Sequence, residues 1–243
     1  MKIYSILLLV LTHTSFTTYA ADKIEIQSTD GLTISADYYP SEKKSLGVIL
    51  LCHQAGWSRG EYTKTGPWLA SLGYDAIAID QRSGRTINGI KNLVAEQAKK
   101  NKLDTNYISA KPDIEAAIQA ISKRFKQKII LLGSSYSAGL AVRLAGEGHP
   151  KLKAIAAFSP GEYYENKSYL QEVLGKIKVP TFITASKKEV QQYQQLWKLI
   201  PTNVLTLSVP NSRGHHGSRA LWKSKTGYQE YRAEFQRFLK SLN

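Results

Sequence analysis

The sequence predicts an α/β fold: one domain, residues 21–243, built on a mostly parallel eight-stranded sheet with an N-terminal hairpin and helices on both faces. Short apolar segments alternate along the chain with longer amphipathic segments, which is the pattern of strands joined by helical crossovers. Several of these apolar segments, such as "GVILLC" at 47–52, are continuous rather than alternating. Continuous apolar runs are typical of parallel strands that are buried on both faces.

The first twenty residues have the layout of a secretory signal peptide. Lys2 precedes an apolar run from Ile3 to Leu11, and small and polar residues follow as far as Ala20. The run is too short to span a bilayer, and no cysteine near residue 20 offers a site for a lipid anchor. We therefore expect cleavage before Ala21 and an exported protein, periplasmic or secreted, with no transmembrane segment after removal of the signal.

The first elements of the mature chain are expected to be a hairpin and two buried strands. Segments 23–28 and 32–39 largely alternate between apolar and polar residues and flank "TDG", which is a turn signal. A strand is expected at 47–52. A helix that ends near Gly73 is expected at 66–74, and a further strand at 74–80. The polar segment 81–111 is predicted to be a long loop or a partly helical excursion.

The second half of the chain alternates regularly between helices and strands. The helix at 112–125 has Pro112 in its first turn and Asp113 where the helix dipole favours an acid. A second polar excursion, rich in tyrosine, is predicted at 160–175. The remaining expected strands are 128–133, 153–159, 181–185 and 203–209, and the remaining expected helices are 138–148, 189–199 and 226–242.

Charge and cysteine content limit the classes of partner. The net charge of +14 attracts anions, but the lysines are scattered and no motif interleaves them with aromatic residues. We therefore expect a solvated basic surface and no nucleic-acid partner. Cys52 is the single cysteine, which excludes an internal disulfide, and its apolar neighbours indicate a buried small side chain. The sequence has no Cys/His cluster with zinc-like spacing, so no metal or other cofactor is expected.

The segment "GSSYSAG" at 133–139 stands where a strand should run directly into a helix. A nucleophilic serine on such a turn is flanked by small residues two positions away on each side. Ser135, between Gly133 and Ser137, fits this pattern and is the preferred nucleophile. Ser137, followed by Gly139, is the alternative, and either serine could instead cap the helix.

A serine hydroxyl needs a base, and histidine is the usual one. Among the five histidines, His215 and His216 lie in the loop after the last strand, at the same sheet edge as Ser135. We prefer His216 because it directly precedes Gly217, and His215 remains the alternative.

The histidine in turn needs a carboxylate to fix its tautomer and to stabilise its protonated form. The loop after strand 181–185 contains "SKKEV", in which Glu189 is the carboxylate available. The alternative role for Glu189 is that of a first-turn acid stabilised by the helix dipole.

An oxyanion formed at Ser135 requires backbone N–H donors. The first expected donor is Tyr136, directly after the serine, and the second is Ala55 in the loop after strand 47–52, with Gln54 as the next candidate. His53 is expected to be structural.

The segments "LLCHQAGWSRGEY", "AIAIDQRSG", "GSSYSAG", "ITASKKEV" and "GHHGSRAL" together resemble the α/β-hydrolase superfamily, and within it the dienelactone-hydrolase-like branch. The resemblance implies Ser135 as nucleophile, His216 as base and Asp80 as a structural residue at a strand end. This sequence departs from the pattern in lacking the second glycine of the turn and in having glutamate where aspartate is more usual. The dienelactone hydrolases themselves use a cysteine nucleophile, so dienelactone is not the expected substrate.

The sequence thus predicts an exported serine hydrolase that cleaves a small ester or thioester. An acyltransferase or a peptidase could use the same three residues, and a non-catalytic binding module could keep the same fold. The aromatic residues of the loops supply the expected substrate-binding side chains, Trp57, Tyr163 and Tyr164.

Overall fold

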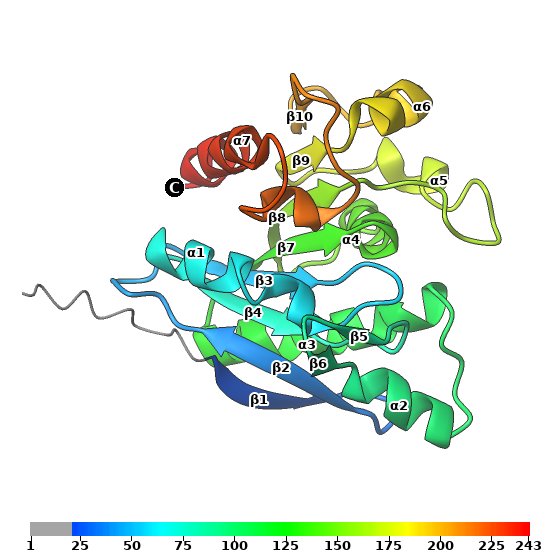
Figure 1. The fold of residues 1–243 in the computed structure, drawn as a ribbon. Coiled ribbons are helices and arrows are strands. Elements are labelled where there is room, and N and C mark those ends of the chain that lie inside the picture. The colour runs from blue at the N-terminus through cyan, green and yellow to red at the C-terminus, as the bar shows by residue number, and fades with distance from the viewer. Residues whose placement is uncertain (1–20) are drawn as a thin grey trace, which may run out of the picture.

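The computed structural model describes residues 21–243, and an eight-stranded sheet runs through the middle of it (Figure 1). The predicted signal peptide, residues 1–20, lies outside the described residues. The strand order is β1-β2-β4-β3-β7-β8-β9-β10. β1 pairs with β2 and β2 with β4 in antiparallel fashion, and every other neighbouring pair in this sheet is parallel. The predicted α/β architecture with an N-terminal hairpin is therefore confirmed.

The eight strands of this sheet correspond one to one with those expected from the sequence. They are β1 (Asp22–Gln27), β2 (Thr33–Tyr39), β3 (Val48–Cys52), β4 (Asp75–Ile79), β7 (Ile129–Ser134), β8 (Leu152–Phe158), β9 (Thr181–Thr184) and β10 (Leu205–Ser208).

Helices follow most of the parallel strands. They are α1 (Thr65–Ser71), α2 (Leu93–Lys100), α3 (Lys111–Phe125), α4 (Tyr136–Gly146), α5 (Gln171–Leu174), α6 (Lys187–Trp197) and α7 (Tyr228–Ser241). Within 21–243, no helix is both long enough and apolar enough to cross a membrane.

The two faces of the sheet are covered by different helices. Alternate residues of a strand point to opposite faces, so Leu50 and Leu51 of β3 belong to different apolar clusters although both are fully buried. The cluster of Leu50 includes residues of α2, α3, α4 and α6, and the cluster of Leu51 includes residues of α1 and α7. Figure 1 shows α1 and α7 together on one side of the strands. This double burial explains why the central strands are continuously apolar.

The two polar excursions contain short elements. The segment 81–111 holds α2 and a small hairpin, β5 (Thr86–Ile87) with β6 (Ile90–Lys91), and the segment 160–175 holds α5. The hairpin was not predicted. Its turn residues Asn88 and Gly89 both have positive φ, 51° and 75°, as an Asn-Gly hairpin turn requires. Strands of two residues are too short to show periodicity, so this dipeptide was the available signal.

Candidate active site

The turn between β7 and α4 places Ser135 at the carboxyl end of a central strand. Ser135 adopts φ 61° and ψ −120°, in the region that favours glycine, and its N–H donates to the carbonyl oxygen of Phe158 at 2.8 Å. Gly133 makes the turn possible, because a Cβ there would lie 2.4 Å from the backbone oxygen of Ser137. The sequence therefore forms a tight strand-to-helix turn that presents one serine.

Ser137 lies below this turn and is fully buried. Its hydroxyl donates to the carbonyl oxygen of Cys52 at 2.8 Å and accepts from the N–H of Ser134 at 2.9 Å. These bonds connect α4 to the ends of β3 and β7. The Ser137 hydroxyl is thus occupied by backbone partners, away from the histidines.

His216 lies next to Ser135, and His215 does not. The Nε2 atom of His216 is 2.8 Å from the Oγ of Ser135, and its Nδ1 atom is hydrogen-bonded to Oε1 of Glu189. His215 makes a backbone bond instead, from its N–H to the hydroxyl of Tyr231 at 3.2 Å. The structure therefore brings Ser135, His216 and Glu189 into one hydrogen-bonded chain, although 81 positions separate the serine from the histidine.

The carboxylate of Glu189 is held on both oxygens. While Oε1 faces His216, Oε2 accepts from the hydroxyl of Ser186 at 2.6 Å and from the hydroxyl of Ser159 at 3.1 Å. Burial alone would raise the pKa of Glu189, but the hydrogen bonds from His216 and Ser186 outweigh it and lower the pKa to about 2. Glu189 is therefore ionised beside the imidazole at neutral pH.

The two amides expected to bind an oxyanion occupy suitable positions. Tyr136 is the first residue of α4, so its N–H has no acceptor within the helix. Across residues 21–243, we find no backbone acceptor for the N–H of Ala55, whereas the N–H of Gln54 donates to Oε2 of Glu61 at 2.7 Å. Gln54 is therefore occupied, and Ala55 and Tyr136 stay the candidates.

His53 is fully buried at the end of β3. Its Nδ1 atom is 2.8 Å from the carbonyl oxygen of Gln54, and its Nε2 accepts from the N–H of Gln81 at 3.0 Å. Desolvation lowers the pKa of His53 to about 4. A neutral ring that donates to Gln54 and accepts from Gln81 fits these contacts, and it is a structural role.

Asp80 is also structural in its contacts. Its carboxylate accepts from the N–H and Nη1 of Arg59, at 2.8 and 2.6 Å, and from the N–H of Leu93 at 3.0 Å.

Within residues 21–243, no three His, Cys, Asp or Glu side chains gather in a way that could hold a metal ion.

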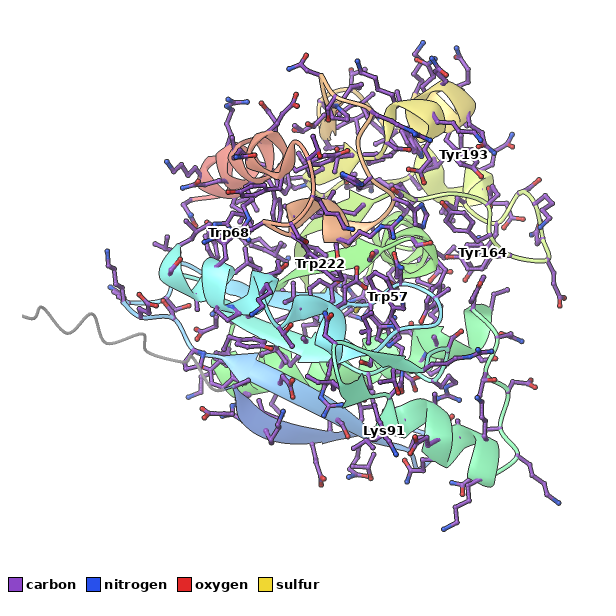
Figure 2. The ribbon with its side chains drawn as sticks, in the orientation of Figure 1. Trp57, Trp68, Lys91, Tyr164, Tyr193 and Trp222 are labelled. Carbon is purple, nitrogen blue, oxygen red and sulfur yellow. The ribbon has the colours of Figure 1, made fainter. Side chains whose placement is uncertain are left out.

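The predicted substrate-binding aromatics have different surroundings. Trp57 and Trp222, both labelled in Figure 2, stack with ring centroids 5.4 Å apart. Trp57 also lines a cleft of about 480 Å³ together with Ala55 and Tyr107. Tyr163 is half-buried, and its ring lies edge-on to that of His216, with centroids 6.3 Å apart.

Tyr164, by contrast, is 2% exposed, and its hydroxyl donates to the carbonyl oxygen of Tyr136 at 2.5 Å. A Cβ on Gly139 would lie 2.4 Å from this hydroxyl, so the tyrosine fills the space over α4. These contacts assign Tyr164 to the support of the turn rather than to the substrate cleft.

Two residues of the site were missed by the sequence reasoning. Ser159, with φ 58°, donates to Glu189 and accepts from the N–H of Gly217 at 2.9 Å. Its position at the carboxyl end of β8 was a usable signal. Glu61, in the loop after β3, carried no such signal, because its contacts come from distant segments.

The sheet order, the tight turn at Ser135 and the histidine after the last strand together define the α/β-hydrolase fold. The chain matches the Dienelactone hydrolase family over residues 35–203, and it belongs to this family of hydrolases. No curated protein matches the sequence.

Three solved structures with the same fold have low sequence identity to this chain. An esterase from Pyrococcus furiosus is 18% identical with a TM-score of 0.69, over 93% of this chain and 94% of the esterase. Dienelactone hydrolase from Anabaena variabilis is 13% identical with a TM-score of 0.69, over 91% of this chain and 97% of that one. An acylaminoacyl peptidase from Pyrococcus horikoshii is 16% identical with a TM-score of 0.68, over 93% of this chain but only 42% of the peptidase.

Proposed function

We propose that the protein is a serine esterase in which Ser135 is the nucleophile, His216 the general base and Glu189 the residue that orients His216. The observation that carries the proposal is the hydrogen-bonded chain from Ser135 Oγ through the imidazole to Glu189. Membership of a hydrolase family and the esterase among the similar structures support it.

The reaction follows from this geometry. Nε2 of His216 takes the proton of Ser135 while Oγ attacks the ester carbonyl carbon, and the N–H groups of Ala55 and Tyr136 bind the resulting oxyanion. The tetrahedral intermediate then expels the alcohol or thiol, which receives its proton from His216. Water, activated by His216, attacks the acyl-enzyme and releases the acid and free Ser135.

We further propose that the substrate is a small ester or thioester bound beside Ala55, with Trp57 and Tyr163 against it. A cleft of about 480 Å³ that Ala55 and Trp57 line supports the position of Trp57 beside a small substrate, and the contact of Tyr163 with the His216 ring supports the position of Tyr163.

Export is the remaining part of the proposal. The basic, apolar and small-residue order of residues 1–20 supports it. When the full chain is expressed in a bacterium, we expect the exported protein to begin at Ala21, which N-terminal peptide mass mapping checks. A mature chain that retains Met1 would contradict export by a cleaved signal.

Labelling with a fluorophosphonate, followed by peptide mapping, tests the nucleophile. We expect an adduct on Ser135 in the wild type and in Ser137→Ala, and none in Ser135→Ala, with ester hydrolysis reduced more than about 10³-fold in Ser135→Ala. An adduct on Ser137 would move the site by two residues. A folded wild type that gives no adduct would exclude the serine-hydrolase function and favour a binding module. Product analysis with added alcohols and with peptides separates an esterase from an acyltransferase or a peptidase.

A further inference from the structure

Glu61 is a fully buried carboxylate held by three neutral donors. Its Oε2 accepts from the N–H of Gln54 at 2.7 Å. Its Oε1 accepts from the hydroxyls of Ser134 at 2.8 Å and Ser218 at 2.5 Å. A buried carboxylate is costly unless its oxygens are hydrogen-bonded, so these three bonds are strong constraints on the residues that donate them.

Each of the three donors lies beside a different part of the proposed machinery. Gln54 precedes the oxyanion donor Ala55, Ser134 precedes the nucleophile, and Ser218 is two residues beyond His216. The Ser218 N–H also donates to Ser134 Oγ at 2.8 Å, which closes the network. Glu61 therefore joins three segments that are far apart in the sequence and that must keep a fixed spacing during catalysis.

The contact with Gln54 has a direct geometric consequence for Ala55. The carbonyl oxygen of Gln54 belongs to the same peptide plane as the N–H of Ala55, and it faces Nδ1 of His53 at 2.8 Å. His53 therefore holds the plane that contains the Ala55 N–H, and Glu61, on the Gln54 N–H, holds the preceding peptide plane, so both planes that meet at the Gln54 Cα are fixed. The direction of the Ala55 N–H is therefore set by these buried contacts before any substrate binds.

We propose that Glu61 is a positioning residue that holds the oxyanion-binding loop at its working distance from Ser135. This inference rests on the proposed esterase function and adds to it a group that touches neither substrate nor reacting atoms. Because a displacement of about 1 Å in such a site can cost about 10²-fold in rate, loosening this network should lower kcat.

The test is the isosteric substitution Glu61→Gln, assayed with p-nitrophenyl acetate at pH 8. Burial raises the pKa of Glu61 to about 7, so the wild-type group is ionised at this pH. An amide has one acceptor oxygen and cannot serve both the serines and the Gln54 N–H. We expect kcat to fall about 10- to 100-fold, less than the roughly 10²- to 10³-fold fall for complete loss of an oxyanion donor, because the Ala55 N–H is displaced and not removed, while KM changes less than about 3-fold.

The control is Tyr74→Phe. Tyr74 directly precedes β4, at the amino ends of the parallel strands, whereas Ser135 lies at their carboxyl ends. The Tyr74 hydroxyl is buried and donates to the carbonyl oxygen of Leu239 at 3.0 Å, so its loss affects stability without touching the loops at Ser135. We expect wild-type kcat and KM from this variant. Ser218→Ala should lower kcat less than Glu61→Gln does, and the double variant Glu61→Gln/Ser218→Ala should be no slower than Glu61→Gln, because both changes act on one network.

The outcomes separate the two proposals. A wild type without a fluorophosphonate adduct refutes the proposed function, and the inference about Glu61 falls with it. A labelled, active wild type with unchanged kcat in Glu61→Gln refutes the positioning role alone, as does a loss that lies entirely in KM. If Glu61→Gln does not fold, Ser218→Ala decides the question: a kcat equal to that of the wild type would overturn the inference.

Discussion

Ser135 adopts a backbone conformation that costs about 1–3 kcal/mol for a residue with a side chain. The surrounding turn maintains it: the Ser135 N–H is bonded to Phe158, and the Ser137 hydroxyl ties the start of α4 to the end of β3. This conformation places the Ser135 hydroxyl beyond the carboxyl end of β7, within hydrogen-bond distance of His216. Small residues around the turn are thus a steric requirement of the site.

Gly133→Ala tests this requirement. The added Cβ would lie 2.4 Å from the Ser137 oxygen and 2.5 Å from the Ala138 nitrogen, both backbone atoms that cannot rotate away. We expect a loss of about 1–3 kcal/mol in unfolding free energy from overpacking, and a fall in kcat/KM of about 10²-fold or more as Ser135 shifts. Denaturant unfolding and ester hydrolysis measure the two effects.

Gly175→Ala is the matched control for that substitution. Gly175 has φ −68°, and the nearest atom to its added Cβ is the Leu199 oxygen at 3.7 Å. The same change there should leave activity intact and stabilise the fold slightly. Equal activity in both variants would show that the turn at Ser135 relaxes freely.

At the scale of the element, the N-terminus of α6 serves the helix and the site together. Ser186 caps the helix, and Glu189 completes the capping box with Oε2 while its Oε1 faces His216. The two roles considered for Glu189, a helix acid and the orienting carboxylate, are therefore compatible. The cap fixes the carboxylate rotamer that the imidazole requires.

Ser186→Ala should therefore affect both stability and activity. Loss of the cap costs about 1 kcal/mol, and loss of the hydroxyl bond raises the low pKa of Glu189 and frees its side chain. We expect kcat to fall about 2- to 10-fold, since the backbone N–H of Ser186 and the Ser159 hydroxyl still hold Oε2. Thermal unfolding and steady-state kinetics on the same samples measure this.

The control for Ser186→Ala is Asn166→Ala, which removes an exposed side chain that bonds to the Ser168 N–H and to Glu172 and not to Glu189. It should change stability at most modestly and leave kcat unchanged. If Ser186→Ala loses stability but no activity, the cap does not position Glu189.

The sequence was informative wherever an element has its own local pattern. The parallel strands could be predicted because burial on both faces makes them continuously apolar. The proximity of Ser135, Glu189 and His216 could be predicted because each follows the carboxyl end of a strand. Helix α6 begins at 187 rather than the expected 189, since the Ser186 cap decides its start and apolar periodicity does not. The contacts of Glu61 could not be predicted, because the three segments that supply them meet only in the folded chain.

At the scale of the whole molecule, two fully buried groups titrate in opposite senses. Burial raises the pKa of Glu61 to about 7 and lowers that of His53 to about 4. The folded state therefore keeps the proton of Glu61 where the unfolded chain, with a pKa of 4.5, releases it, so this group lowers stability as pH rises from 4.5 to 7. The folded state excludes the proton of His53, so that group lowers stability as pH falls from 6.5 to 4.

Glu61→Gln removes the contribution of Glu61 to the pH dependence of the unfolding free energy and should leave the contribution of His53 measurable. Between pH 4.5 and 6.5 the two nearly cancel in the wild type, whereas in the variant the free energy of unfolding should rise with pH, relative to the wild type, by about 1.4 kcal/mol per pH unit. Urea unfolding of both proteins at four pH values in this window measures the difference. The other titrating groups are the same in both proteins, so their contributions cancel in the difference between the two unfolding free energies. A constant difference across the window would mean that Glu61 ionises in the fold as it does in water, and that its three donors fully offset its burial.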